Sequence, residues 1–298
     1  MSHRYLAPVR WGDMDAQGHV NNAAYLDYLQ DARVDFLVDA TTGLGALLDT
    51  GVLVVNHQVE YIAPVQFRGE PVTVDLWIDA LGASRFVVGY ELRDADGRLA
   101  LRARTGAVPY DLAANRLRRL LPTEREVLAG HLAPAEPLRV VDKVPTSATA
   151  HHWPLTVRWS DLDSYGHVNN VKYYDYVQEA RIALMTEALG WTGDEVWSLV
   201  RQDLEYARPI DFRAEPYEVI TSVAHVGTRS LTLSVAIRDP ALPATVFATA
   251  RSIVVGEAAF TEEQHQRLNR TDWLTVPSRN RRATELTPSS ADHRWSRG

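Results

Sequence analysis

Cysteine is absent from this chain of 298 residues, which excludes disulfide bonds, thiolate nucleophiles and cysteine-based metal sites. Basic residues are fewer than acidic ones, 31 against 38, and the net charge of −7 is the opposite of what a nucleic-acid-binding surface needs. Long apolar runs are also missing, since no stretch approaches the ~20 residues of a membrane-spanning helix. The first ten residues lack the apolar segment of a signal peptide, so we expect a cytoplasmic protein that does not enter a membrane.

What the chain does contain is a long internal repeat. Residues 9–33 align with residues 157–181 at an offset of 148 and match at 16 of 25 positions. A weaker block, which includes Glu60-Tyr61 and Glu205-Tyr206, aligns at an offset of 145. Each copy is nearly 150 residues long, which is the size of a domain and far above that of a solenoid repeat. The sequence therefore predicts a duplicated domain.

Each copy shows the same series of expected elements. A short strand, a polar loop and a helix are followed by strand-like runs and a short terminal helix. In the first copy the apolar helical positions are Tyr25, Leu29, Ala32 and Phe36, and the strand-like runs cover 52–61, 71–80, 86–93 and 99–109. One helix is best buried on the concave face of a curled antiparallel sheet. We expect an α+β protein in which two such sheets join edge to edge, as in a two-fold dimer.

Composition sets the expected boundaries. The first domain covers 1–132, a linker rich in Pro, Ala, Thr and Ser covers 133–150, and the second domain covers 151–270. Residues 271–298 are polar and unpatterned, and we expect them to form a mobile tail. A short strand is expected over 5–11. A capping box is expected to open each terminal helix: Thr123 with Glu126, and Thr261 with Gln264.

The polar loop before each long helix carries the clearest chemical pattern. Its repeated residues are Asp13, Asp15, Gly18, His19, Asn21 and Asn22, matched by Asp161, Asp163, Gly166, His167, Asn169 and Asn170. Backbone N–H groups at a helix start are unpaired and favour a developing anion. A carboxylate and an imidazole beside such amides suit acyl transfer. Helix caps and turns use the same residue types, but their retention in both copies favours the functional interpretation.

These segments resemble the hotdog-fold thioesterases of the 4-hydroxybenzoyl-CoA thioesterase and acyl-CoA thioester hydrolase type. The signature WxDxDxxGHVNNxxY covers 11–25 and 159–173, and the second copy is also similar to plant acyl-ACP thioesterases. The resemblance extends over about residues 5–110 and 153–256. It implies a tandem duplicated hotdog fold, in which a curled antiparallel sheet wraps a long helix, and cleavage of acyl-CoA to free acid and CoA without a cofactor.

The resemblance also assigns roles within the loop. The second aspartate of the motif, which is Asp15 or Asp163, would be the catalytic carboxylate, acting as a nucleophile or a general base. The backbone N–H of Asn22 or Asn170 would bind the oxyanion. The substrate-binding loop would include two glycines, Gly18 and Gly166. We expect each site to form at the interface of the two halves.

Further roles follow from the similarity to acyl-ACP thioesterases. His19 and His167 would orient the carboxylate or help to protonate the leaving group. Glu60 and Glu205, on a later strand, would fix the imidazole tautomer or orient water. An asparagine two residues after the aspartate does not carry over, because its positions hold two other residues, Gln17 and Tyr165. The two copies therefore need not share one mechanism.

Several repeated residues allow a structural interpretation. Asp13 and Asp161 are expected to bond loop amides, and Tyr25 and Tyr173 to pack in the core. Trp11 and Trp159 are also expected to pack, whereas Asp27 and Asp175 either face solvent or line the acyl pocket. Four arginines either meet CoA phosphates or are solvated: Arg68, Arg85, Arg213 and Arg229. His151 and His152 are adjacent without an acidic neighbour in sequence, so no metal site is expected.

The sequence thus predicts a thioester hydrolase whose substrate is acyl-CoA. An acyl-ACP substrate and a hotdog dehydratase are the alternatives among enzymes, and a non-catalytic acyl-CoA-binding protein is the alternative from another class. Antiparallel sheets with exposed edges tend to find partners, so we also expect a homo-oligomer of double-hotdog units.

Overall fold

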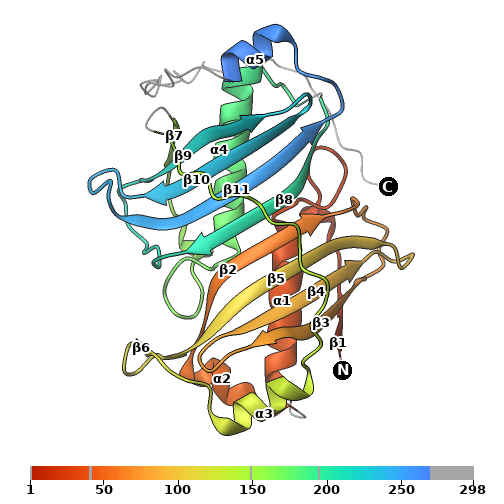
Figure 1. Cartoon of the computed structure of the whole chain (residues 1–298), viewed down its shortest axis with the longest axis vertical. Coiled ribbons are helices and arrows are strands. Elements are labelled where there is room, and N and C mark those ends of the chain that lie inside the picture. The colour runs from red at the N-terminus through yellow and green to blue at the C-terminus, as the bar shows by residue number, and fades with distance from the viewer. Residues whose placement is uncertain (1, 40–41, 148–149, 194, 269–298) are drawn as a thin grey trace, which may run out of the picture.

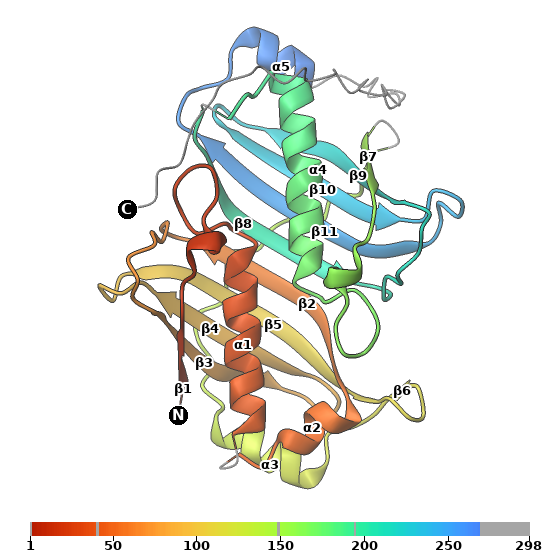
Figure 2. The ribbon, with the colours of Figure 1, turned by 180° about the vertical axis from the view of Figure 1, so that it is seen from behind.

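The computed structural model describes residues 2–39, 42–147, 150–193 and 195–268, so the tail predicted from residue 271 lies outside the described residues. Figure 1 shows two similar units stacked along the long axis of the molecule, each with a sheet and one long helix. Figure 2, from behind, shows both long helices against the same concave side of the sheets. The predicted tandem arrangement of helix and curled antiparallel sheet is confirmed.

The first copy contains β1 (His3–Ala7), the 3-10 turn η1 (Trp11–Asp13), α1 (Ala24–Val38), α2 (Gly45–Thr50), β2 (Val52–Tyr61), β3 (Val72–Leu81), β4 (Phe86–Arg93), β5 (Leu99–Asp111), β6 (Arg116–Leu117) and α3 (Pro122–Gly130). The second copy contains β7 (His151–Leu155), η2 (Trp159–Asp161), α4 (Lys172–Leu189), β8 (Trp197–Tyr206), β9 (Tyr217–Val226), β10 (Ser230–Arg238), β11 (Val246–Gly256) and α5 (Glu262–Leu268). The long helix follows the polar loop in both copies, as the sequence predicts.

The two copies join through one pair of strands. The strand order is β1-β3-β4-β5-β2-β8-β11-β10-β9-β7, so β2 and β8 stand side by side at the middle of one continuous sheet. They pair antiparallel, with Gln58 opposite Asp203. These two residues are counterparts at the offset of 145 seen in the sequence, so the pseudo-two-fold axis passes between them. The expected edge-to-edge junction is confirmed.

One hydrophobic core runs through this junction. The apolar helical positions predicted for α1, namely Tyr25, Leu29, Ala32 and Phe36, are all buried. The same core cluster includes residues of the second copy such as Tyr174 and Leu204. Because the cluster is shared, each copy supplies part of the apolar surface that covers the other.

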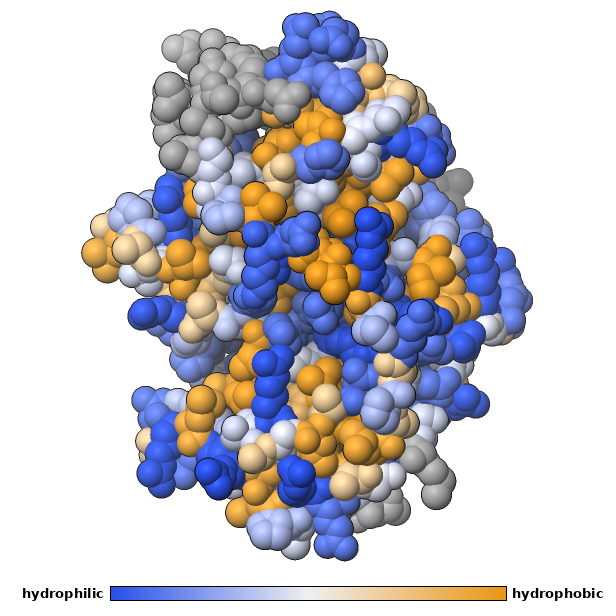
Figure 3. Space-filling model, in the orientation of Figure 1, coloured by the Kyte–Doolittle hydropathy of each residue, from blue (hydrophilic) through white to orange (hydrophobic). Residues whose placement is uncertain are grey.

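The chain between the copies covers the opposite, outer face of the sheet. Residues 133–147 contain no helix or strand, and in Figure 1 this yellow-green segment crosses the front of the sheet. The backbone N–H of Arg139 donates to Glu60 Oε1 (2.8 Å), and that of Ser147 donates to Ser222 Oγ (2.7 Å). Figure 3 shows hydrophilic and hydrophobic residues interspersed on this face. We call residues 133–147 the strap.

Proline ends the first strand of one copy and is tolerated within the first strand of the other. β1 stops at Ala7, ahead of the predicted end, because Pro8 has no N–H to donate to a strand ladder. β7 contains Pro154 and is still a strand, since it lies at the edge of the sheet. Trp11 and Trp159, which we expect to pack, begin the 3-10 turns and are 79% and 74% exposed; Trp159 packs edge-on against the ring of Phe212 at the surface.

The predicted capping boxes have different outcomes. In the second copy Gln264 N–H donates to Thr261 Oγ1 and Thr261 N–H donates to Gln264 Oε1, so the predicted box is confirmed. In the first copy it is wrong. There α3 begins at Pro122, and the carboxylate of Glu124 accepts the N–H of Leu121 (2.8 Å), because proline favours the first helical position.

No helix in the described ranges is long and apolar enough to cross a membrane.

The shared core predicts that the two copies unfold together. Leu204, at the junction, is fully buried, so Leu204→Ala should lower the free energy of unfolding by about 2–5 kcal/mol. The exposed Leu242, in the β10–β11 connection, gives a matched control, and Leu242→Ala should change it by less than about 0.5 kcal/mol. Urea denaturation followed by both fluorescence and circular dichroism should show one transition in each variant. Two separate transitions in Leu204→Ala would contradict a shared core.

Candidate active site

The polar loop is held in place by its first aspartate. Asp13 Oδ2 accepts the backbone N–H of Arg10 (2.8 Å) and the hydroxyl of Tyr28 (2.6 Å). Asp161 has the same role in the second copy, where it binds Arg158 N–H and the Tyr176 hydroxyl. These contacts agree with the structural role that the sequence suggests for the two residues.

The glycine of the motif forms the turn of the loop. Gly18 has a φ of 77° and its N–H donates to Asp15 O (3.1 Å), and Gly166 repeats this with a φ of 81°. This left-handed conformation favours glycine at both positions. The structure thus shows a conformational role for both glycines, and their part in substrate binding stays a prediction.

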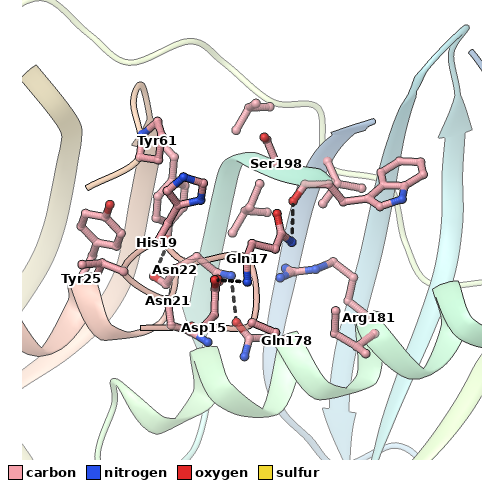
Figure 4. A pocket seen from close by; sticks show the side chains of 18 of the residues that line it. Asp15, Gln17, His19, Asn21, Asn22, Tyr25, Tyr61, Gln178, Arg181 and Ser198 are labelled. Atoms are coloured by element: carbon pink, nitrogen blue, oxygen red, sulfur yellow. Dashed lines mark hydrogen bonds between the residues drawn. The ribbon is translucent and has the colours of Figure 1, made fainter. Parts of the chain in front are cut away.

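A cavity of about 510 Å³ opens beside the first loop, between the two copies. The first copy contributes residues of the loop and the end of β2, including Asp15, Gln17, His19, Asn22 and Tyr61. The second copy contributes α4, β8 and the segment before β8, including Gln178, Arg181, Met185, Trp191 and Trp197. Figure 4 shows Asp15 and Gln17 of the loop on the side of Gln178 and Arg181 of α4. The first loop thus borders a cavity between the halves, which is where the sequence analysis expects a site.

Asp15 and Asn22 are fixed by different bonds within this cavity. Asp15 Oδ1 accepts the backbone N–H of Gln17 (2.9 Å). Asn22 is held at both ends, because its carbonyl accepts the Tyr61 hydroxyl (2.8 Å) and its Nδ2 donates to Gln178 Oε1 (2.8 Å). The backbone N–H of Asn22 has no acceptor among the described residues. The site thus places a held carboxylate and an unpaired amide in one cavity.

His19 also lines this cavity, but it does not bond the carboxylate. The two residues are joined through the backbone, with Asp15 N–H donating to His19 O (2.9 Å). The His19 ring makes no hydrogen bond with any residue that the structure describes. The imidazole is therefore available to a bound ligand, and the expected orienting contact on Asp15 is not present in this structure.

The two glutamates do not lie with the aspartates. On β2, Tyr61 faces the cavity, and since side chains alternate along a strand, the neighbouring Glu60 faces the outer side. There it binds Arg201 (2.9 Å) and the strap. Glu205 likewise binds Lys143 of the strap (2.6 Å), which lowers the pKa of its carboxyl group. The predicted role of both glutamates beside the imidazole is corrected to a contact with the strap.

The second loop has different surroundings. Asp163 Oδ1 accepts the N–H of Tyr165, and the Tyr165 hydroxyl donates to Leu48 O of α2 (3.2 Å). Gln17, its counterpart, instead donates to Trp197 O at the start of β8 (3.4 Å), and the described residues between α4 and β8 form no helix. Tyr165 in the second loop therefore replaces Gln17 of the first. Helix α2 lies beside the second loop, where the first loop has the lining of a cavity.

The asparagine of the second loop faces a buried histidine. Asn170 Oδ1 lies 3.4 Å from His57 Nε2, and the Asn170 carbonyl accepts the Tyr206 hydroxyl (2.7 Å). The backbone N–H of Asn170 also has no acceptor in the described part of the chain. His167 Nε2 lies 3.6 Å from Asp211 Oδ1, at the surface. The second loop thus keeps the unpaired backbone N–H at Asn170, but the Asn170 side chain faces His57, whereas that of Asn22 bonds Gln178.

The structure also shows the surroundings of the two repeated tyrosines and of the four arginines considered for CoA phosphates. Tyr25 and Tyr173 are buried, and Tyr25 accepts the N–H of Val65 (3.0 Å), while burial raises its pKa to about 12. Two of the four candidate arginines already have carboxylate partners: Arg68 with Asp96 and Arg213 with Asp239. Arg85 donates to Asn56 Oδ1, and Arg229 is exposed.

The adjacent histidines have acidic partners that their sequence neighbours do not reveal. His151 lies 3.3 Å from Glu187, and His152 lies 2.6 Å from Glu218. The chain brings these carboxylates from α4 and β9, so the absence of acidic neighbours in sequence was a poor guide. Within the described residues, no group of three or more His, Asp or Glu is placed to hold a metal ion.

Sequence reasoning missed three residues of the cavity. Tyr61, Gln178 and Arg181 all lie in repeated segments, and each has an identical counterpart in the other copy. That identity was visible in the alignment. What the alignment did not show is that Gln178 and Arg181 contribute to the site of the opposite copy.

Comparisons with known proteins agree with this architecture. The family model of the thioesterase-like superfamily matches residues 9–137 and 157–261. Two solved structures share the fold over most of both chains. The 12:0-ACP thioesterase from Umbellularia californica has a TM-score of 0.68 at 18% identity, covering 86% of this chain and 94% of that one. An acyl-ACP thioesterase from Bacteroides thetaiotaomicron has a TM-score of 0.65 at 16% identity, covering 85% and 97%.

Two curated relatives share closer sequence over shorter segments. The palmitoyl-acyl carrier protein thioesterase of Arabidopsis thaliana is 32% identical over 122 residues, which is 38% of this chain and 29% of that protein. The dodecanoyl-[acyl-carrier-protein] hydrolase of Cinnamomum camphora is 31% identical over 174 residues, which is 52% of this chain and 44% of that protein. The matched segments therefore span less than half of either relative.

The buried histidine predicts a loss of stability in acid. Burial, with the positive charge of Arg33, lowers the pKa of His57 to about 3. Below about pH 6.5 the unfolded chain binds a proton at this position and the folded chain does not, so stability falls with pH from there toward pH 3, by up to about 1.4 kcal/mol per pH unit. His57→Gln, which installs the residue found at the counterpart Gln202, removes this contribution.

The measurement is urea denaturation at pH 7 and pH 5. Between these values the wild type should lose up to about 2 kcal/mol more stability than His57→Gln. His225→Gln, at an exposed histidine of β9, is the matched control and should follow the wild type. Equal pH dependence of the wild type and His57→Gln would show that His57 is not buried in its neutral form.

Proposed function

Because this chain belongs to the thioesterase-like superfamily, we propose that it hydrolyses acyl thioesters in the cavity between its two copies, with Asp15 as the catalytic carboxylate. One observation carries the proposal. The same cavity is lined by Asp15, by His19 and by Asn22, whose backbone N–H lacks an acceptor among the described residues. A carboxylate and an unpaired amide are the two groups that acyl transfer requires.

The proposed chemistry uses the thioester's own reactivity. Asp15 either attacks the carbonyl carbon or removes a proton from a water that attacks it. The carbonyl oxygen becomes negative and accepts a hydrogen bond from Asn22 N–H, which Tyr61 keeps in place through the Asn22 carbonyl. When the C–S bond breaks, the thiolate leaves and takes up a proton, for which His19 is the available donor in the cavity. If Asp15 attacks first, water then hydrolyses the resulting anhydride.

We propose acyl-CoA as the substrate. The part of the cavity along α4 and the adjoining strands is apolar, with Ile182, Met185, Leu199 and Val254 in its lining, and this suits a hydrocarbon acyl group. Acyl-ACP is the second candidate, favoured by the activities for which the two curated relatives are named. Both substrates present the same thioester, so the difference lies in what surface the carrier contacts.

The first loop is proposed as the active one. At the second loop the Tyr165 hydroxyl is bonded to Leu48 O, and α2 occupies the position where the first loop has its open lining. Asp163, His167 and Asn170 are therefore proposed as a retained copy of the motif with little or no turnover. This is a proposal about access, because the carboxylate itself is present in both loops.

Association into a homo-oligomer remains a proposal that rests on the sheet. The order of strands ends at β1 and at β7, and strands at a sheet edge have unpaired backbone groups that favour pairing. Light scattering of the purified chain should then give a mass that is a multiple of 33.3 kDa. A mass of one chain would reject the association.

The active-site proposal predicts that the two aspartates differ in effect. Asp15→Asn should lower kcat by about 10²–10⁴-fold, because it removes the nucleophile or base and keeps the size of the side chain. Asp163→Asn, the matched variant of the other copy, should leave kcat within about threefold of the wild type. Release of free thiol, followed with a disulfide dye, measures both.

The same assay identifies the substrate. A series of acyl-CoAs from acetyl to palmitoyl, with benzoyl and hydroxybenzoyl, should include at least one that is hydrolysed, and matched acyl-ACPs give the comparison of carriers. Equal loss of activity in both variants would make the two loops equivalent. Full activity in Asp15→Asn would reject the assignment of the carboxylate. Binding of acyl-CoA without any turnover would support a non-catalytic protein.

A further inference from the structure

Two buried arginines lack a carboxylate partner within the part of the chain that the structure describes. Five are buried in the described part of the chain, and three of them lie against carboxylates: Arg104 with Asp79, Arg201 with Asp203, and Arg251 with Glu205. The other two, Arg33 and Arg181, form no ion pair with any described residue. They are counterparts at the offset of 148, each at the end of the repeated segment.

Arg181 lines the cavity of the first loop and has open bonding capacity there. It is 4% exposed, and its Nη1 donates to Gln202 Oε1 at 3.3 Å, an uncharged oxygen that also accepts the Ser252 hydroxyl. Its Nε and Nη2 have no acceptor among the described residues. Neither atom is fully buried. These N–H groups therefore face the space of the cavity.

A cation in this position remains charged but is poorly compensated. Burial lowers the pKa of Arg181 to about 10, so the guanidinium is still protonated at neutral pH. Burying a charge without a counter-charge is unfavourable unless a ligand supplies one. The arrangement therefore indicates an anion that is present only when the cavity is occupied.

The position of Arg181 places it near the oxyanion amide. Gln178, one turn earlier on α4, bonds the side chain of Asn22 (2.8 Å). Side chains on a helix lean toward its N-terminus, so a long side chain at 181 covers the turn that carries Gln178. The positive charge of Arg181 also acts on Tyr61, where it opposes the rise in pKa caused by burial. Tyr61 in turn holds the carbonyl of Asn22.

We propose that Arg181, supplied by the second copy, is a catalytic residue that contacts the negative oxygen formed in the first copy's site. This inference rests on the proposed thioester hydrolysis and adds a cation to its oxyanion site. Attack on the carbonyl carbon moves the C=O π electrons onto oxygen, where Arg181 and Asn22 N–H share the charge. When the C–S bond breaks, the charge returns to re-form C=O and the thiolate departs.

A fixed anion on the substrate is the competing explanation for the unpaired cation. Beyond Arg181 the lining along α4 and β11 is apolar, with Ile182, Met185 and Val254. A carboxylate at the far end of an acyl group would therefore lie among apolar side chains and away from the guanidinium. The geometry favours the charge that develops at the thioester itself.

Arg33 provides a control that the chain itself supplies. It is equally buried, at 6% exposed, and its Nη1 donates to the hydroxyl of Tyr90 (3.2 Å). It lies beside His57 at the second loop, which is proposed to be inactive. Arg33→Met and Arg181→Met thus remove the same buried charge from counterpart positions, and only one of them belongs to the proposed site.

The experiment compares turnover with ground-state binding. For the best acyl-CoA of the series, Arg181→Met should lower kcat by about 10²–10³-fold, as expected when an oxyanion donor is removed. The Kd of a non-hydrolysable thioether analogue, measured by calorimetry, should change less than threefold, because the analogue never carries the negative oxygen. Arg33→Met should keep kcat within threefold. Arg181→Lys, which keeps the charge and is expected to fold even if Arg181→Met does not, should show an intermediate kcat.

The outcomes separate this inference from the function on which it rests. Wild-type kcat in Arg181→Met, with Asp15→Asn inactive, would overturn the role of Arg181 and leave the thioesterase proposal intact. A weaker Kd for the analogue with unchanged kcat would overturn it in favour of a ligand for the ground state. Equal losses of kcat in Arg33→Met and Arg181→Met would indicate that both arginines have a structural role and would overturn the catalytic role of Arg181. Absence of turnover in the wild type would overturn both proposals together.

Discussion

Antiparallel pairing of β2 with β8 is the constraint on which the rest of this structure depends. A single copy would expose β2 as an edge strand and leave part of its core uncovered. Pairing Gln58 with its counterpart Asp203 joins the two sheets, and the main hydrophobic cluster then includes residues of both copies. The same pairing brings the loop of the first copy against α4 and β8 of the second. The cavity exists only because the copies meet in this register.

Duplication within one chain allows the two loops to differ. In a symmetric dimer, a change at one loop appears at both. Here Gln17 and Tyr165 occupy counterpart positions, and α2 has no helical counterpart among the described residues before β8. One loop borders a cavity of about 510 Å³, and the other has a tyrosine bonded to α2. The retained motif in the second loop still bonds its turn and helix start, which gives it a structural value apart from catalysis.

Charge is distributed differently on the two sides of the sheet. On the outer side the buried Arg201 pairs with the buried Asp203 and the half-buried Glu60, and the strap binds Glu60. On the concave side, the hydrogen-bond acceptor of Arg181 among the described residues is an uncharged amide oxygen, Gln202 Oε1. Paired buried charges fix a structure, whereas an unpaired one in a cavity is poised for a ligand. Glu60 thus belongs to a set of paired charges on the outer side, whereas Arg181 in the cavity has no carboxylate partner among the described residues.

The sequence alone determined the duplication, the order of helices and strands, the tandem fold and the loop with Asp15, His19 and Asn22, because these depend on local pattern and on similarity between segments. Tertiary structure decided which residues from distant segments share a cavity. A strand alternates its side chains between two faces, so a one-residue difference puts Tyr61 in the cavity and Glu60 under the strap. Arg181 lines the cavity beside the first copy's loop because β2 pairs with β8, and no local pattern encodes that placement.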